Sequence, residues 1–400
     1  MASNKAIPAL TGSESSSSVV RPTLVESTRV PWHIWCSVVA VTSAMIGAHW
    51  DISWHMSIGR DTFWTPAHMA IYLCGVLAGI SCGYLILSTT FGGRVDAQES
   101  GVRIWGFRGP LGAFMAAWGG IAMITSAPFD NWWHNAYGLD VKILSPPHVV
   151  LITGILAVKL GSLILILGAM NRAQGKLRDR LNALFLYIGG TVIIQAGILT
   201  AEHTWRGAMH SASFYRVVAL AIPLPLVAVS KASGRRWAST VVTTVYTAFC
   251  LGMLWILPLF PAEPKLGPVY QRVTHFIPLP FPLLLIAPAI ALDLLRPRIA
   301  SWNPWRQAFV GGTVFLLALI AVQWPFADFL MSPLSRNRVF GTHYFGYNDV
   351  AGFFYDPNQF VALEKTRSQF WIGMAVAFLL AIITTRIGLA WGKWMEQIRR

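Results

Sequence analysis

The chain has 400 residues, of which 54% are hydrophobic and only 12% are charged. Soluble domains carry charge on about a quarter of their residues, so this composition excludes an ordinary soluble enzyme. The net charge of +14 is compatible with a nucleic-acid partner or with the charge asymmetry of a membrane protein, and the placement of the basic residues distinguishes the two.

Ten apolar runs follow one another along the chain, each long enough to cross a bilayer as a helix. Gly and Pro in "PLPLV" and "IPLPFPLLLIAP" predict kinks or breaks within the sixth and eighth runs. The predicted fold class is an all-α, polytopic transmembrane helical bundle of about ten helices. The runs cover 31–50, 65–90, 110–129, 146–170, 182–201, 213–230, 237–260, 274–294, 307–327 and 370–392.

The basic residues gather on one side of this arrangement. With the N-terminus in the cytoplasm, the inner segments hold 20 of the 31 Lys and Arg residues. This is the positive-inside pattern, so the positive charge reports membrane topology and predicts no nucleic-acid partner. We expect a multi-pass protein of a bacterial inner (cytoplasmic) membrane with both termini in the cytoplasm. Residues 1–30 include "TGSESSSSVV" and predict a disordered tail that does not fit a cleaved signal peptide.

Two outer connections share one pattern of scarce residues. "WDISWHMSIGRDTFWTPAHM" joins the first two runs, and "FDNWWHNAYGLDVKILSPPH" joins the third and fourth. Seven positions agree when the first His of each is aligned, with one residue inserted in the second copy. This predicts a parallel internal repeat of helix, polar loop and helix over 31–90 and 110–170. The matched residues are Asp51, Trp54, His55, Gly59, Asp61, Pro66 and His68 with Asp130, Trp133, His134, Gly138, Asp140, Pro146 and His148.

The spacing within each copy indicates a metal site. Asp51 and His55 are four residues apart and share one helix face, and Pro66 marks the first turn of the next helix, which contains His68. Two imidazoles and one carboxylate form a recognised ligand set for Fe(II), Cu or Zn. Asp61 and Asp140 are candidate acceptors for the second N–H of a ligand histidine. The alternative is that each Asp-x3-His is a solvated helix end, and the second copy favours the metal site.

These residues resemble the C subunit of the copper membrane monooxygenases, the particulate methane and ammonia monooxygenases. The resemblance rests on Asp-x3-His-x12-His, formed here by Asp51, His55 and His68. Arg60-Asp61-Thr62 and Thr65-Pro66 lie between its histidines, and Trp54 precedes the first. The second polar trio of that family matches at His134, Pro146 and His148, but Asp130 stands where the family has Asn. The match covers about residues 31–170.

The resemblance implies copper held by Asp51, His55 and His68, with Asp130, His134 and His148 forming a neighbouring second site. It also implies partner subunits, a trimeric assembly, and quinol or another electron donor. Asp61, Asp140 and Arg60 would support the ligands. Two departures stand out: about four additional helices follow residue 230, and no stretch is typical of the periplasmic cupredoxin domain of the B subunit.

Two functions therefore follow from the sequence. The first is a copper-dependent membrane monooxygenase, or its metal-bearing subunit, that activates O2 at the periplasmic side to hydroxylate a small hydrocarbon or ammonia. The alternative is a non-catalytic copper-binding protein that relays or stores metal or stabilises a larger complex. Residues 31–230 would form the metal-bearing core, and 231–400 would add helices.

Other outer residues are assigned more conservatively. His203, His210, His275 and His343 are each expected to be hydrogen-bonded interface residues, and nine of the ten His lie at or near the outer side. The outer segment 328–369 is expected to cap the outer cavity, to contact a partner, or to pack on its own bundle. The four Cys fall within predicted helices and are expected to be unpaired.

Overall fold

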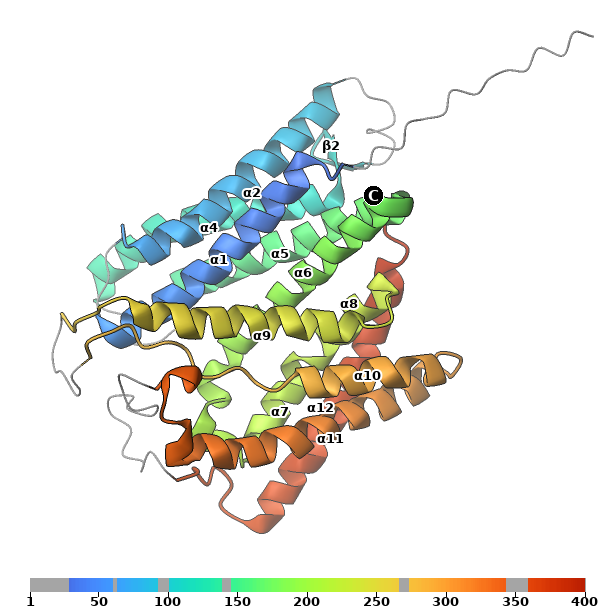
Figure 1. The fold of residues 1–400 in the computed structure, drawn as a ribbon. Helices are drawn as coiled ribbons and strands as arrows, with labels where there is room; N and C mark the ends of the chain where they lie inside the picture. The colour runs from blue at the N-terminus through green and yellow to red at the C-terminus, as the bar shows by residue number, and fades with distance from the viewer. Residues whose placement is uncertain are drawn as a thin grey trace, which may run out of the picture.

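The computed structural model describes residues 29–59, 63–92, 101–138, 145–265, 273–342 and 359–399, and it is almost entirely helical (Figure 1). The predicted disordered tail lies outside the described residues. The four cysteines lie in helices and are free, which confirms their predicted environment.

The first four long helices form two antiparallel pairs. These are α1 (Trp32–Ser57) with α2 (Pro66–Phe91), and α4 (Leu111–Tyr137) with α5 (Pro146–Arg172). Lipid provides no hydrophobic driving force for helix association, so helices in membranes associate largely through close packing. Small residues at the contact allow the two backbones to approach closely. A Cβ on Gly161 of α5 would lie 2.5 Å from the backbone nitrogen of Ala116 on α4.

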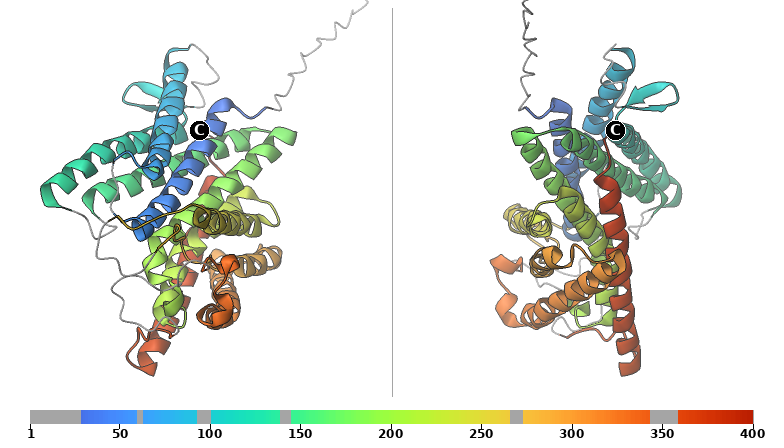
Figure 2. Two further views of the ribbon diagram at one scale, coloured as in Figure 1. Left: turned by 60° about the vertical axis from the view of Figure 1, so that its left-hand side comes forward. Right: turned by 90° about the vertical axis from the view of Figure 1, so that its right-hand side faces the viewer.

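A short hairpin that the sequence did not predict joins α2 to α4. Strands β1 (Val102–Ile104) and β2 (Phe107–Gly109) pair antiparallel, with Trp105 and Gly106 at positive φ in the turn. The hydroxyl of Thr90 on α2 accepts a hydrogen bond from the backbone N–H of Arg108 at 2.9 Å. The hairpin therefore stands at the edge of the bundle beside the end of α2 (Figure 2).

The remaining helices pack onto this group through α6 (Gly175–Thr200), which contacts both α5 and α9 (Ala238–Ile256). The run 213–230 is broken at Pro223 as predicted, giving α7 (Ala212–Ala221) and α8 (Pro223–Ser233). Further along the chain are α10 (Ile286–Ile299), α11 (Pro304–Met331) and α12 (Arg367–Met395). Short 3-10 turns lie at Ala201–His203, Arg206–Ala208, Leu257–Leu259, Pro333–Ser335 and Arg338–Phe340.

Eight helices of the described chain are long and apolar enough to cross a membrane, counting α7 and α8 as one. The chain is thus a multi-pass helical membrane protein. α1 is of similar length but falls outside this set, because Trp and His near its start and Trp, His and Asp toward its end lower its mean hydropathy. α10 has 14 residues, about 21 Å of helix, and is too short to span a bilayer alone.

The eighth run, 274–294, is broken as predicted, but its helix begins only at Ile286, later than the run does. Residues 276–284 are extended, because Pro278, Pro280 and Pro282 lack the N–H that a helix interior requires. Backbone groups of this extended segment are instead paired with side chains of the bundle. The N–H of Leu283 donates to the Tyr246 hydroxyl at 3.0 Å, and that of Leu284 donates to Gln323 Oε1 at 2.9 Å. Non-helical backbone at membrane depth is tolerated where protein satisfies it in this way.

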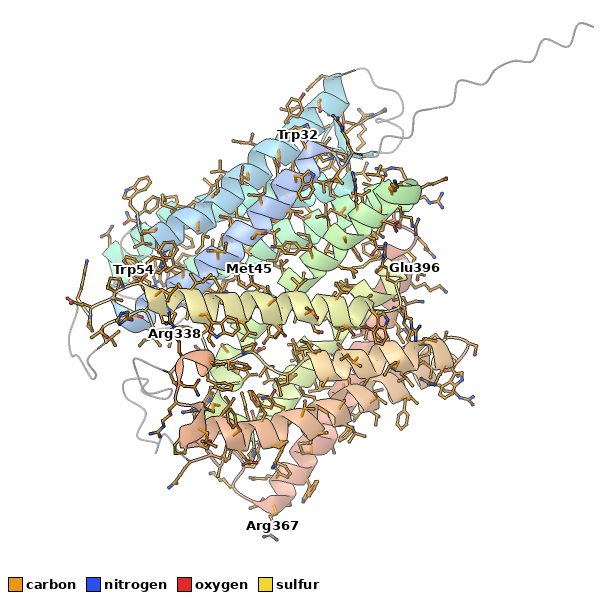
Figure 3. The ribbon with its side chains drawn as sticks, viewed as in Figure 1. Trp32, Met45, Trp54, Arg338, Arg367 and Glu396 are labelled. Carbon is orange, nitrogen blue, oxygen red and sulfur yellow. The ribbon has the colours of Figure 1, made fainter. Side chains whose placement is uncertain are left out.

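Successive passes alternate in direction. Trp32 begins α1, Met45 lies near its middle and Trp54 near its far end, as the labels in Figure 3 show. The side-chain amide of Asn171, at the end of α5, donates to the carbonyls of Met395 and Ile398 at 3.1 and 2.7 Å. The start of α1, the end of α5 and the end of α12 therefore lie at one end of the bundle. The connections after α1 and α4 lie at the other end.

Candidate functional site

The first predicted trio comes together at the contact between α1 and α2. Asp51 and His55 lie on one face of the last two turns of α1, which continues beyond the predicted run 31–50 to Ser57. His68 lies in the first turn of α2. Asp51 Oδ1 is 3.1 Å from His68 Nε2, and Asp51 Oδ2 is 3.9 Å from His55 Nε2. One carboxylate therefore contacts imidazoles from two helices.

The start of α2 explains the position of His68. Pro66 occupies the first helical position, where its missing N–H was unpaired in any case. The hydroxyl of Thr65 accepts a hydrogen bond from the backbone N–H of His68 at 3.3 Å and caps the helix. The cap fixes the first turn, and this places the imidazole of His68 over the end of α1.

The second trio has the same construction on α4 and α5. Asp130 Oδ2 is 3.4 Å from His134 Nε2, and Asp130 Oδ1 is 3.7 Å from His148 Nε2. α5 begins at Pro146, as the sequence predicts, so His148 lies in its first turn. Gly138 ends α4 at φ +85° and ψ −165°, a conformation open essentially to glycine alone. Its carbonyl accepts a hydrogen bond from His134 Nδ1 at 3.2 Å.

That hydrogen bond determines which nitrogen of His134 faces the aspartate. A carbonyl oxygen only accepts, so Nδ1 carries the proton. A neutral imidazole in this tautomer then directs the lone pair of Nε2 toward the carboxylate of Asp130. A lone pair facing an anion is repulsive unless a cation lies between them, either a proton on the ring or a metal ion. Histidines that bind metals commonly hold their second N–H on a carbonyl in this way.

Buried polar atoms without hydrogen-bond partners mark both trios. Oδ1 of Asp51 and Oδ1 of Asp130 are both buried and accept no hydrogen bond, and Nδ1 of His148 is also without a partner. Oδ1 of Asp51 lies only 3.1 Å from His68 Nε2, so the direction of approach, and not the distance, prevents a hydrogen bond. A buried carboxylate oxygen without a partner costs free energy, and a cation between it and the imidazole would remove that cost.

The distances are close to those within a metal site, but the trios are not closed. Ligands about 2.0–2.1 Å from one ion stand about 3.0–3.4 Å apart. Across the described ranges, no three His, Cys, Asp or Glu side chains form a group that could hold one ion. In each trio the aspartate contacts both histidines, but the three side chains do not converge on one point. This explains why the pairwise distances are short and yet no three-ligand group forms. His55 and His148 make the longest contacts, and these are the side chains that would have to move.

Three predicted supporting residues, Arg60, Asp61 and Asp140, lie outside the described residues. The structure does describe the support that α1 receives from the C-terminal half. The hydroxyl of Ser53 donates to the carbonyl of Ile277 at 2.6 Å, and the N–H of Ile277 donates to the hydroxyl of Ser57 at 2.7 Å. The extended segment thus holds the last turns of α1 beside Asp51 and His55. This connection cannot be predicted from local sequence patterns, because it pairs residues more than 200 positions apart.

His49 lies close to Asp51 in sequence but faces elsewhere. Positions two apart on a helix point about 200° from each other. His49 is buried, its Nδ1 lies 3.0 Å from the carbonyl of Met45, and its ring packs edge-on against Phe249 of α9. His49 is therefore a buried core residue of α1 and does not face the first trio.

Lys159 forms a second polar centre within the bundle. It lies halfway along α5 and is fully buried. Its ammonium contacts three acceptors: Met45 Sδ at 2.8 Å, Gln195 Oε1 at 2.9 Å and the carbonyl of Thr191 at 3.2 Å. Intramembrane ionisable residues are costly, and this one joins α1, α5 and α6 at mid-depth.

His210 is a hydrogen-bonded residue, as predicted for it. Its ring is stacked between Trp324 and Phe360, with ring centroids 4.1 and 3.7 Å away. Its Nε2 lies 3.1 Å from the carbonyl of Trp324 and 3.5 Å from Asp328 Oδ1. Within 328–369, the described part packs on its own bundle, since the N–H of Val361 donates to the carbonyl of Gly207 at 2.8 Å. His343 lies outside the described residues.

Fold and site together define the class: a polytopic helical membrane protein with two carboxylate–imidazole clusters at one end of its bundle. Comparison of the chain with models of protein families, with curated proteins and with solved structures finds no match.

Proposed function

We propose that the two trios are transition-metal sites of a copper-dependent membrane monooxygenase, or of its metal-bearing subunit. The observation that carries the proposal is the aspartate in each helix pair that lies between two imidazoles with one buried, unpaired oxygen. Two His and one carboxylate suit copper, iron or zinc, and leave coordination positions open. Copper is proposed over iron and zinc because of the resemblance of the motif.

The residues present fit such an ion. Asp51, His55 and His68 would hold one metal, and Asp130, His134 and His148 the other. Bound copper would supply the redox chemistry for activating O2, with electrons from a quinol or another donor. The protein would orient the ligands through Thr65 and Gly138 and hold the end of α1 through Ser53 and Ser57. The substrate class would be a small apolar or gaseous molecule, a hydrocarbon or ammonia, that arrives through the bilayer.

We further propose that 31–90 and 110–170 are a parallel repeat. Each copy has a helix that ends just after its histidine, a glycine at positive φ four residues after that histidine, and a proline that opens the next helix. Asp130 gives the second trio the carboxylate that the resembled family lacks there, so both trios would bind a cation with the same ligand types. Both would face the periplasm in the topology that the basic residues predict.

One observation favours the second candidate, a copper-binding membrane protein without catalysis. The side chain of His55 is 49% exposed, so the first trio is open to exchange of metal with a partner. A metal-relay, storage or structural subunit would need that access, whereas a hydroxylase requires a dry cavity around its substrate.

Metal analysis of the purified full chain tests the ligand assignment. Asp51→Asn keeps the shape of the side chain and removes its charge. We expect it to lower copper content or affinity by 10-fold or more, and we expect the same of Asp130→Asn at the second trio. His203→Ala, which removes an exposed histidine outside both trios, is the matched control. Unchanged copper binding in both Asp→Asn variants would contradict the assignment.

Activity separates the two candidates. Fully metallated protein is supplied with quinol and short alkanes or ammonia, and oxygen consumption and product are followed. Hydroxylation that is lost in Asp51→Asn would support the enzyme. Retained copper without turnover, in the presence of any co-purifying subunits, would favour the non-catalytic protein.

A further inference from the structure

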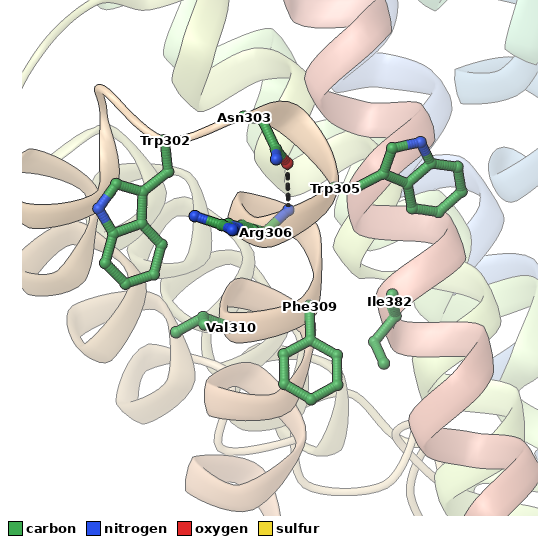
Figure 4. Close-up of a pocket in the computed structure, with 7 residues that line it drawn as sticks. All are labelled: Trp302, Asn303, Trp305, Arg306, Phe309, Val310 and Ile382. Atoms are coloured by element: carbon green, nitrogen blue, oxygen red, sulfur yellow. Dashed lines mark hydrogen bonds between the residues drawn. The ribbon is translucent and has the colours of Figure 1, made fainter.

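A groove of about 410 Å³ opens at the end of the bundle opposite the two trios. It lies between the start of α11 and the facing side of α12 (Figure 4). Its size is within the range of small-molecule sites. Its lining comprises Trp302, Asn303, Trp305, Arg306, Phe309, Val310 and Ile382.

The lining changes from polar to apolar along the helix axis. Asn303 caps α11, and its Oδ1 accepts a hydrogen bond from the backbone N–H of Arg306 at 2.9 Å. Phe309 and Val310 follow three and four residues later, about 5 Å further into the bundle at 1.5 Å per residue. Ile382 of α12 faces them. A molecule in the groove would therefore meet a cation at the helix end and hydrocarbon below it.

Tryptophans mark the level of the membrane interface at this groove. Trp302 is 44% exposed and Trp305 is 62% exposed, and they lie on either side of Arg306 in Figure 4. Trp is enriched where the hydrocarbon meets the headgroups, because its ring is apolar and its N–H is polar. Phe309 is also exposed, at 59%, and continues this surface toward the bilayer.

Two arginines, Arg306 in the lining of the groove and Arg386 next to its residue Trp305, have no carboxylate partner among the described residues. The exposed guanidinium of Arg306 makes none of the ion pairs found there. Arg386, one helical turn from Ile382, lies over the ring of Trp305 with its guanidinium carbon 5.4 Å from the centroid. Its Nε is buried and has no hydrogen-bond partner. The groove lining contains no acidic residue. Unpaired guanidinium groups beside an apolar groove suit a phosphate with a hydrocarbon tail.

We propose that this groove binds an anionic glycerophospholipid from the leaflet at this end of the bundle. The phosphate would lie between Arg306 and Arg386, and an acyl chain would run along Phe309, Val310 and Ile382. A free phosphate would leave the apolar floor uncovered. A zwitterionic lipid would bring a third positive charge to a site that already holds two. The site is independent of metal binding at the opposite end.

Lipid retention measures the proposal directly. The purified full chain is placed in nanodiscs of phosphatidylglycerol or phosphatidylcholine, transferred to detergent, and examined by native mass spectrometry for bound lipid. We expect a preference for phosphatidylglycerol of about 10-fold, since each basic residue near a charged lipid contributes a few-fold. Arg306→Gln with Arg386→Gln should reduce that preference to near one. Arg306→Gln alone, an exposed change that leaves the packing intact, should reduce it in part.

The control changes charge by the same amount elsewhere at this end. Arg103→Gln with Arg298→Gln alters two exposed arginines outside the groove and should leave the preference unchanged. Glycerophosphoglycerol, which has the headgroup but no acyl chains, should not displace the lipid. Three results would overturn the proposal: no preference in the wild type, the same loss in the control pair, or displacement by the headgroup alone.

Discussion

Asp51 and Asp130 each present one carboxylate to two imidazoles from different helices. The geometry arises from two local rules. The aspartate and the first histidine are four residues apart on one helix, and a proline starts the next helix two residues before the second histidine. The Asp–His contact within α1 and the one within α4 could be predicted from the sequence. The contact across helices could not be derived from spacing alone, because it depends on how closely α1 approaches α2 and α4 approaches α5.

Gly138 is the residue whose backbone most directly affects the second trio. Its φ of +85° costs any other residue about 1–3 kcal/mol, although the space around it is open. We expect Gly138→Ala to destabilise the end of α4 and weaken metal binding by His134, whose Nδ1 donates to the Gly138 carbonyl. Metal affinity of the second trio is measured in an Asp51→Asn background.

Gly252→Ala is the matched control for that change. Gly252 lies within α9, has regular helical backbone and also has open space, so alanine there should be neutral or stabilising by up to about 1 kcal/mol. If Gly138→Ala matched it in thermal stability and in metal affinity, the backbone argument would fail.

Among helices, the closest packing is between α4 and α5. Glycines on both helices face each other's backbone, so each helix lies in a groove of the other. The sequence contains these glycines, but it does not indicate which neighbouring helix each of them faces. The same limitation applies to Lys159, whose three acceptors lie on α1 and α6, far from it in the chain.

Gly161→Ala is expected to disturb this helix pair. Its Cβ would lie 2.5 Å from the nitrogen of Ala116 and 2.6 Å from the carbonyl oxygen of Gly112, and backbone cannot rotate away. We expect a loss of about 1–3 kcal/mol, measured as a lower denaturation midpoint in detergent. Gly83→Ala on α2, where nothing lies within 4 Å, should show no loss. Equal midpoints for the two variants would refute the close approach.

The whole molecule is a bundle whose passes alternate between two ends. The trios lie at one end, and the groove beside Arg306 lies at the other. The C-terminal half also contacts the helix of the first trio, because its extended segment forms hydrogen bonds with Ser53 and Ser57 at the end of α1.

Accessibility to a membrane-impermeant maleimide tests this arrangement. In a chain with Cys36, Cys74, Cys82 and Cys250 replaced by Ala, we introduce Trp64→Cys, Ser368→Cys, Gln174→Cys and Ser301→Cys one at a time. The first two should label from the periplasm, at the end of the trios, and the last two only from the cytoplasm. Labelling of Trp64→Cys and Ser301→Cys from the same side would show that the passes do not alternate as described.

The sequence by itself determined the membrane class, most of the helices and the members of each trio within one helix, because these follow from apolar length, proline placement and local spacing. At 276–284 the prolines predicted a kink or break, but not that the whole segment would lie outside a helix. Tertiary structure alone decided how closely the second imidazole of each trio approaches its aspartate, what holds the end of α1, and that Arg386 lies over Trp305. Those contacts join residues far apart in the chain, and packing of complete helices brings them together.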